Sequence, residues 1–331
     1  MNDATIAFVP RETVSRTLES LDSILTHTST PHDLIIVIAC YPEPLRAELR
    51  RIGREHGAEI VEMDGFVTPN EARNAALAKV KTEYVAFIDN DVEVRADWLG
   101  PLVACSRMHQ ASVVGPMIFE LYPPFTKIHM AGGEAGLVRP RNGTFSMRDI
   151  HYHAHETIGG DLRFAEAFET GLIEFHAVLV ETAWLRSAGG LDPEFCSTEE
   201  HWDMCLQAKD AGKKIMIEPA SEVNYSPPRM PTEDDIRFYN IRWSREWFTH
   251  DRRRLKKKYK VRRSGTAGTW KWVVGHRTHV SIQSVRSRFP KLSYPTARAI
   301  TSRFLIPLID MFPPRQLRAD LKAWRERRAQ R

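Results

Sequence analysis

The sequence predicts an α/β protein in which a mixed, mostly parallel sheet is flanked by helices and followed by a basic, largely helical C-terminal extension. Apolar strand-like runs alternate with helices four times in about the first 90 residues. Residues 1–250 hold 24 Lys and Arg against 38 Asp and Glu, whereas residues 251–331 hold 23 against 4. We therefore expect one α/β domain over residues 1–228 and a basic helical extension over residues 229–331.

Four strands and three helices are expected before residue 90. The strands are apolar runs at residues 5–9, 34–39, 58–61 and 84–88. Thr13 is a candidate cap for a helix that places Val14, Leu18, Leu21 and Leu25 on one face. A second helix is expected between Pro44 and Gly57, and Thr68-Pro69-Asn70-Glu71 has the pattern of a capping box for a third. Right-handed crossovers would place these strands in one parallel sheet.

Later elements are spaced less regularly. A strand at residues 112–119 is expected to follow a helix that begins near Asp97, and residues 122–170 read as irregular. A further strand is expected at residues 172–180, where Glu174 and His176 would share one face because side chains alternate along a strand. A helix from Thr198 or Glu199 to Gly212 and a last strand at residues 214–217 complete the prediction.

Two aspartates follow the strand at residues 84–88, at the edge where open parallel sheets bind ligands. Carboxylates one residue apart repel each other unless a cation lies between or beside them. Mg²⁺ and Mn²⁺ prefer carboxylate oxygens and are usually shared with substrate phosphates. Asp89-Asn90-Asp91 therefore indicates a metal-bound phosphate ester, and the alternative is a solvated acidic turn.

Composition narrows the class of protein. The hydrophobic content of 42% and the charged content of 27% are those of a globular protein, and no run of 18 apolar residues predicts a membrane span. The N-terminal residues lack the pattern of a secretory signal. The four cysteines show neither zinc-ligand nor disulfide-framework spacing. We expect reduced cysteines and a cytoplasmic location.

Four blocks of the sequence, taken in order, resemble one known family. They are residues 6–10, residues 70–76 (Asn-Glu-Ala-Arg-Asn-Ala-Ala), residues 84–91 followed by Trp98-Leu99, and residues 189–195 (Gly-Gly-Leu-Asp-Pro-Glu-Phe) followed by residues 199–206 (Glu-Glu-His-Trp-Asp-Met-Cys-Leu). Over about residues 4–225 their order and spacing are similar to those of family 2 glycosyltransferases. That family has a GT-A fold, a Rossmann-like domain that uses a nucleotide-sugar donor.

The resemblance implies an inverting transfer of a sugar to a hydroxyl of a glycan or lipid-linked glycan of the cell envelope. It implies Mg²⁺ or Mn²⁺ on Asp89 and Asp91. The residues that it implies for donor binding are Pro10, Arg11, Glu12, Asn70, Arg73, Asp89 and Asn90. From the residue types alone, Arg73 could equally pair with Glu71 or Asp89.

Two departures from the family pattern affect the predicted site. The second strand ends without the carboxylate that often holds the donor base or ribose, so Arg11 or Glu12 would share that task. The family's Glu-Asp pair, whose second residue is the general base in many inverting members, reads Glu200-His201 here. His201 and Glu200 are both candidate bases, and Asp203 is a candidate to orient either one.

Other histidines have weaker signals. His151, His153 and His155 alternate and would share one face of an extended segment, but no partner cluster for a zinc site is visible, and we interpret the segment as a solvated or acceptor-facing loop. The resemblance places Glu174 and His176 under the acceptor site. A polar ladder satisfied inside the sheet is the alternative.

The basic tail suggests a partner. Residues 252–263 are rich in Lys and Arg, and residues 304–312 are apolar but too short to cross a bilayer. We expect peripheral attachment to an anionic membrane at the cytoplasmic face, with packing on the domain or in a dimer as the alternative. Nucleic acid is not expected because no known binding module accompanies the charge.

Two competing interpretations of the whole chain remain at this stage. One is a nucleotidyltransferase built on a similar sheet, and the other is a non-catalytic member that only binds sugars or scaffolds an assembly. The Glu-x-x-Asp pattern from Glu200 to Asp203 favours sugar transfer, whereas the two departures favour a degenerate member. The sequence identifies neither the donor sugar nor the oligomeric state.

Overall fold

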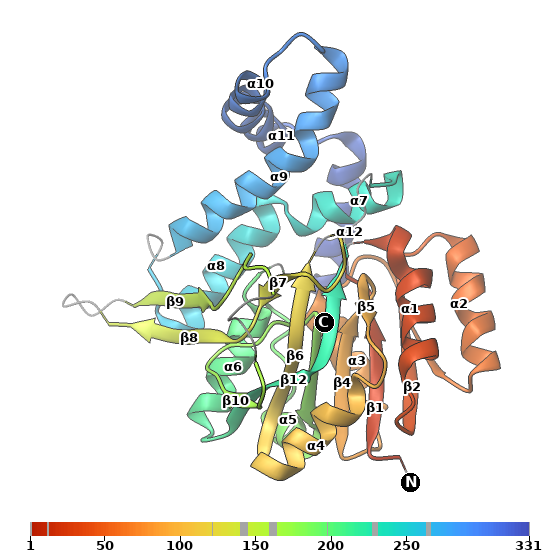
Figure 1. The fold of residues 1–331 in the computed structure, drawn as a ribbon. Coiled ribbons are helices and arrows are strands. Elements are labelled where there is room, and N and C mark those ends of the chain that lie inside the picture. Colours follow the sequence, from red (N-terminus) through yellow and green to blue (C-terminus); the bar gives the residue numbers. More distant parts are fainter. Residues whose placement is uncertain are drawn as a thin grey trace. The chain divides into compact units, whose positions relative to one another are not determined.

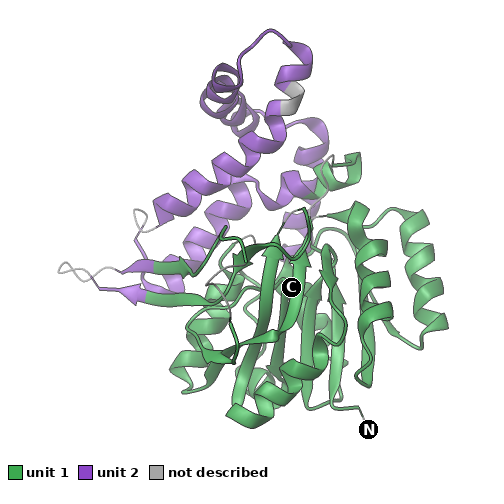
Figure 2. Cartoon of the chain, in the orientation of Figure 1, with its two compact units in different colours: residues 1–136, 148–238 green, residues 137–147, 239–331 purple. Residues whose placement is uncertain are grey.

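A computed structural model describes residues 2–11, 13–120, 122–139, 145–158, 164–196, 198–226, 231–262 and 266–330. The chain divides into two compact units (Figure 2). Unit 1 comprises Met1–Gly136 and Arg148–Phe238, and unit 2 comprises Leu137–Met147 and Tyr239–Arg331. The division at residue 238 comes ten residues after the boundary expected from composition, and the ends of a β-hairpin also belong to unit 2.

Unit 1 is built on one large mixed sheet flanked by helices (Figure 1). Strands β1 (Ala4–Val9), β2 (His32–Ala39), β3 (Glu59–Met63) and β4 (Tyr84–Asp89) are parallel, in the order β3-β2-β1-β4. The first, second and fourth of these strands consist almost wholly of buried residues, as expected for a sheet covered on both faces. The sequence-based assignment of all four strands is confirmed.

The other half of the sheet brings in antiparallel strands. Strand β11 (Ala177–Glu181) lies antiparallel between β4 and β6 (Ala111–Glu120), and β12 (Lys214–Tyr225) runs parallel to β6. Five short strands were not predicted from the sequence. β5 (Val92–Val94), β7 (Lys127–Met130) and β10 (Phe168–Glu169) belong to this sheet, and β8 (Gly133–Val138) and β9 (Ser146–His151) form a separate hairpin.

The helices of unit 1 follow the predicted order, except that α5 (Thr182–Ser187) was not predicted. They are α1 (Thr17–His27), α2 (Glu43–Glu55), α3 (Pro69–Leu77), α4 (Leu99–His109), α5 and α6 (Glu200–Asp210), and α7 (Glu233–Arg242) runs into unit 2. The capping box before α3 is confirmed, because the Thr68 hydroxyl accepts from the Glu71 amide while the Glu71 carboxylate accepts from the Thr68 amide. The predicted cap at Thr13 is wrong, since its side chain makes no capping hydrogen bond.

Two further sequence-based assignments are wrong. Helix α1 buries Thr17, Ser20, Leu21 and Ile24 and leaves Leu18 39% exposed, so its buried face is rotated from the predicted one. The strand expected at residues 172–180 begins only at Ala177. Residues 172–176 instead form irregular backbone and a turn, and the apolar side chains there misled the assignment because they are buried without strand pairing.

Unit 2 is mainly helical. Its helices are α8 (Arg245–Tyr259), α9 (Ala267–Arg288), α10 (Tyr294–Ile300), the π-helical turn η3 (Thr301–Leu305), α11 (Ile306–Met311) and α12 (Arg315–Ala329). Trp243, Phe248 and Val273 form a buried apolar cluster, and an ion pair of 2.9 Å joins Arg277 to Asp310. Among the described residues, no helix has the length and apolar character that crossing a bilayer requires.

The capping box gives a test of the start of α3. Replacing Thr68 by Ala removes the hydroxyl that caps the Glu71 amide, and we expect the free energy of unfolding to fall by about 1 kcal/mol. Thr68→Ser retains the acceptor and should cost less. Thr26→Ala, at an exposed position inside α1, is the matched control and should have little effect. Urea denaturation measures the three variants, and equal losses for Thr68→Ala and Thr68→Ser would contradict the capping role.

Candidate active site

Asp89 lies at the carboxyl end of β4, beside Val9 at the end of β1, and its side chain is fully buried. Each of its carboxylate oxygens accepts a hydrogen bond from a different arginine: Arg73 Nη2 at 2.8 Å on one oxygen and Arg11 Nη1 at 2.8 Å on the other. Buried carboxylates require such charged partners. The edge of the sheet therefore carries an aspartate that two guanidinium groups already neutralise.

Arg73 is held in place from several sides. The first turn of α3 points it at Asp89, Asn70 Oδ1 accepts from it at 3.3 Å, and its guanidinium stacks 3.9 Å from the ring centroid of Phe175. Burial lowers the pKa of Arg73 to about 10, so it still carries its charge at neutral pH. Asn70 in turn donates to the Asp192 carbonyl oxygen at 3.0 Å. Asn70 and Arg73, both predicted to bind the donor, are packed behind Asp89 with no exposed surface.

Asn90 anchors the segment that follows β1. Its Oδ1 accepts from the Arg11 amide at 2.7 Å, and its Nδ2 donates to the Thr13 carbonyl oxygen and the Thr17 hydroxyl, both at 2.9 Å. These contacts fix the position of Arg11, whose side chain reaches Asp89. Pro10 is buried at the start of this segment, and Glu12 lies outside the described residues.

Asp91 is the second carboxylate of the motif and is 1% exposed. Ligand atoms of Asp89, Asp91 and His176 all lie within 4.8 Å of one another. Two carboxylates and an imidazole are a donor set that Mn²⁺ or Mg²⁺ accepts. The residues therefore fit a divalent ion, with Asp91 better placed than Asp89 as a ligand because both Asp89 oxygens are occupied by arginines.

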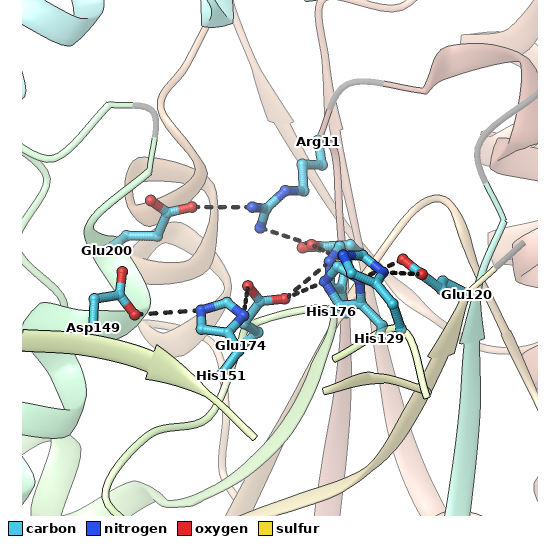
Figure 3. A network of polar contacts seen from close by, with 10 residues as sticks. Arg11, Glu120, His129, Asp149, His151, Glu174, His176 and Glu200 are labelled. Carbon is cyan, nitrogen blue, oxygen red and sulfur yellow. Dashed lines mark hydrogen bonds and ion pairs between the residues drawn. The ribbon is translucent and has the colours of Figure 1, made fainter. Parts of the chain in front are cut away.

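The first turn of α6 carries the two candidate bases. Glu200 is fully buried, with Oε1 3.3 Å from Arg11 Nη2 (Figure 3). His201 is 8% exposed, lies with His151 and Asp149 in a second group of possible metal ligands, and has no hydrogen-bond partner for Nε2 within the described residues. Burial lowers the pKa of His201, which keeps its imidazole neutral at neutral pH.

Asp203, predicted to orient one of these bases, accepts a hydrogen bond of 2.6 Å from Gln207 one turn further along α6. The structure thus gives Asp203 a partner on its own helix. Its predicted orienting role stays a prediction.

A network of alternating carboxylates and imidazoles lies beside Asp89 (Figure 3). His129 on β7 lies between Glu120, at 3.0 Å, and Glu174, at 2.8 Å. His176 Nε2 is 3.3 Å from the same Glu174 oxygen, and His176 Nδ1 is 3.7 Å from Asp89. Glu174 and His176 therefore come together as predicted. They do not lie within a strand, however: both precede β11, Glu174 in irregular backbone and His176 in a turn.

The pKa values of the groups in this network are shifted in different directions. Burial would lower the pKa of His129, but the charge of Glu174 and the hydrogen bonds of Glu120 and Glu174 outweigh it and raise the pKa to about 10. Burial lowers the pKa of His176. Burial would raise the pKa of Glu174. The neighbouring His129 outweighs this effect and holds the pKa of the carboxyl well below its usual range. One protonated and one neutral imidazole thus flank a single carboxylate.

The alternating histidines do not share one face. His153 and His155 have φ angles of 58° and 69°, so residues 152–155 form a turn instead of an extended segment. His155 Nδ1 contacts Glu120 at 2.6 Å, His153 contacts Glu156, and His151 Nδ1 lies 3.6 Å from Glu174. The expectation of a common face is wrong, and partner carboxylates that the sequence did not reveal are present.

The end of β2, where the sequence lacks the expected carboxylate, carries Cys40 and Tyr41. Cys40 has a φ angle of 61°, and Tyr41 is 5% exposed. Burial, together with the charges of nearby groups that include Asp91, raises the pKa of Tyr41. A buried phenol therefore lies near the aspartates, in the region where the sequence lacks a carboxylate.

The sequence of this chain was compared with protein families and with known proteins. Residues 10–160 match glycosyl transferase family 2, a range that includes Arg73 and Asp89 but not Glu200. Two kinds of curated relative show low identity. The Pre-mycofactocin glycosyltransferase of Mycobacterium tuberculosis is 25% identical over 176 residues, which are 52% of this chain and 33% of that protein. Uncharacterized protein y4gI of Sinorhizobium fredii is 27% identical over 187 residues, which are 54% of this chain and 20% of that protein.

The chain spans a third or less of the length of these relatives. A solved structure, the crystal structure of GalNAc-T7 with UDP, GalNAc and Mn²⁺, superposes with a TM-score of 0.52 at 13% identity, covering 95% of this chain and 58% of that chain. This likeness shows the fold. The family match over residues 10–160 and the named relatives support a glycosyltransferase of family 2, and the shared α/β architecture shows the GT-A fold.

Proposed function

We propose that the chain transfers a sugar from a nucleotide-sugar donor to a hydroxyl acceptor with inversion at the anomeric carbon. The observation that carries the proposal is the meeting of Asp89, Asp91, Arg11 and the start of α6 at the carboxyl edge of the sheet. Open α/β sheets bind nucleotides at this edge. The structure of GalNAc-T7 with UDP, GalNAc and Mn²⁺ has the same fold and supports a donor of this class.

The donor diphosphate would engage Arg11. Its guanidinium lies 2.8 Å from Asp89 and 3.3 Å from Glu200, and its side chain is 11% exposed, whereas that of Arg73 is fully buried. A phosphate can compete for the donors of Arg11 because both phosphates and carboxylates accept charge-assisted hydrogen bonds. Asn70, Arg73 and Asn90 would then act by holding Asp89 and the Arg11 segment in position.

Mg²⁺ or Mn²⁺ would be held by Asp91, with Asp89 and His176 beside it. Such an ion neutralises the charge that develops on a departing nucleoside diphosphate. Asp89 contributes less to this role, because its two oxygens are bound to Arg11 and Arg73. Asp91 is therefore the residue on which the proposed metal requirement chiefly depends.

His201 is the general base that we propose. A base must take the proton of the acceptor hydroxyl, and a buried imidazole with a lowered pKa is neutral and able to do so at neutral pH. Glu200, the alternative, forms an ion pair with Arg11 through Oε1 at 3.3 Å. The acceptor that we propose is a glycan or lipid-linked glycan of the cell envelope, approaching on the side of Glu174 and His176.

Unit 2 is proposed to attach the chain to an anionic membrane at the cytoplasmic face, where a lipid-linked acceptor would be found. Its α9–α11 region exposes large apolar side chains, including Phe289, Phe304, Leu308, Met311 and Phe312. Residues 251–331 supply 23 Lys and Arg. Apolar contact and basic charge together are what attachment to an anionic surface requires.

The proposed base predicts a specific loss of turnover. With a panel of nucleotide-sugars and released nucleoside diphosphate as the readout, His201→Gln should lower kcat about 10²–10⁴-fold while donor binding persists. His27→Gln, an exposed histidine in α1, is the control. If Glu200→Gln abolishes turnover and His201→Gln does not, the base is Glu200. Donor binding without any nucleoside diphosphate release by the wild-type chain would support a non-catalytic member instead.

The same assignment predicts a pH dependence. Because burial lowers the pKa of His201, the wild-type kcat/KM should stay level as pH falls to 6.5 and decline only below it. The decline reflects protonation of the base. In the His201→Gln variant the residual activity should lack this acidic limb, and an unchanged limb would rule out His201 as its source.

The proposed metal predicts that EDTA abolishes donor turnover and that added Mg²⁺ or Mn²⁺ restores it. Asp91→Ala should abolish turnover in the presence of excess metal, because the main oxygen ligand is lost. Asp22→Ala, at an exposed position of α1, is the matched control and should retain activity. Full activity of the chelated chain would contradict the metal requirement.

The proposed membrane contact predicts that the full chain floats with vesicles that contain phosphatidylserine, and less so at high salt. Replacing Phe304 and Phe312 together by Ser should reduce flotation, since they are 69% and 70% exposed. Met108→Ser, which changes a 77% exposed apolar residue in unit 1, is the control. No flotation of the wild-type chain would contradict membrane attachment.

A further inference from the structure

Three side chains converge close to the proposed donor site, and one of them, His176, also lies beside the ion proposed on Asp91. Glu174 Oε2 lies 2.8 Å from His129 Nε2 and 3.3 Å from His176 Nε2, and ligand atoms of all three residues lie within 4.8 Å of one another. The residues come from β7 and from the segment that enters β11. Two imidazole nitrogens thus converge on one carboxylate oxygen.

The other nitrogen of each imidazole faces a second carboxylate. His129 Nδ1 is 3.0 Å from Glu120 Oε2, and His176 Nδ1 is 3.7 Å from Asp89 Oδ2. Histidines that bind metals usually have a carboxylate or carbonyl at their second nitrogen, which fixes the ring and raises its basicity. Figure 3 shows Glu120 beside His129 on the side away from Glu174. His129 therefore has a hydrogen-bonded outer carboxylate, as metal-binding histidines usually do, whereas His176 Nδ1 is within ion-pair distance of Asp89 but makes no hydrogen bond among the described residues.

The rings are also fixed by packing. His176 stacks on Tyr225, with 4.3 Å between ring centroids and 28° between ring planes, and His129 lies 5.7 Å from the same tyrosine ring. His176 is 7% exposed, so its imidazole is held away from solvent. Side chains whose orientation is set before a ligand arrives lose less entropy on binding.

We propose that His129, Glu174 and His176 bind a zinc-type divalent ion, distinct from the ion proposed on Asp91. Two histidines and one glutamate are a ligand set that suits Zn²⁺, and three protein ligands leave a further position for water or a substrate oxygen. The Asp91 site is richer in carboxylate oxygens and suits Mg²⁺ or Mn²⁺ better. His176 faces both sites, through Nε2 and Nδ1 respectively.

Charge balance is consistent with this occupant. Glu120 and Glu174 place two carboxylates around His129. A divalent ion bound there would supply positive charge beside both carboxylates. His151 Nδ1, 3.6 Å from the other oxygen of Glu174, approaches the same carboxylate from the far side.

Cobalt titration of the full chain after removal of metals tests the proposal. Co²⁺ bound to imidazole nitrogen gives visible d–d absorption, which reports binding without an activity assay, and Zn²⁺ should displace it at one equivalent. His129→Gln and Glu174→Gln should each weaken binding at least tenfold. Glu120→Gln keeps all three ligands and should weaken binding about 10–100-fold through the orientation of His129.

Two matched controls separate this site from others. His153→Gln removes an exposed histidine outside the cluster, and Asp91→Asn removes the main ligand of the other proposed ion, so both should keep the cobalt absorption. Zn²⁺ should also raise the melting temperature of the wild type but not that of Glu174→Gln. The proposal is overturned if no stoichiometric absorption develops, if the cluster variants bind like the wild type, or if Asp91→Asn alone abolishes binding.

Discussion

The buried ion pair between Arg73 and Asp89 is the interaction on which the arrangement of the site depends. Both side chains are fully buried, so each charge requires the other, and loss of one partner from such a pair typically costs about 3–5 kcal/mol. The pair ties α3 to the end of β4, and the stacking of Arg73 on Phe175 ties both to the segment before β11. Arg11 then joins the segment after β1 to the same carboxylate. The site is thus assembled around one neutralised charge.

Much of the fold could be predicted from local patterns. The strands β1, β2 and β4 are mostly apolar, and Thr68 and Glu71 form the capping box that their spacing indicates. Prediction failed where burial is not accompanied by regular pairing. Residues 172–176 are as apolar as a strand, but Glu174 turns to His129 and the backbone turns before Ala177, a consequence of tertiary contacts that no local pattern encodes.

The residues of the site were predicted only in part, because some of their contacts join distant parts of the sequence. A motif locates Asp89 and Asp91, and the pairing of Arg73 with Asp89 was one of the alternatives left open. The contact of Arg11 with Asp89 was not predicted, because it joins positions 78 residues apart. His129 was missed altogether. Its one local signal is the alternation of Lys127-Ile128-His129-Met130, in which Ile128 and Met130 are buried and His129 takes the other face. The partners of His155 were missed because its positive φ angle redirects the side chain.

The middle residue of the aspartate motif has a role of its own. Asn90 accepts from the Arg11 amide through one atom and donates to the Thr13 carbonyl oxygen and the Thr17 hydroxyl through the other. Since the Thr17 hydroxyl itself donates to Val14, an aspartate at position 90 would set a carboxylate oxygen against two acceptors, despite having the same shape. In sequence comparisons within this subgroup, the identity of that middle residue should therefore covary with residues 13 and 17 rather than with the choice of metal.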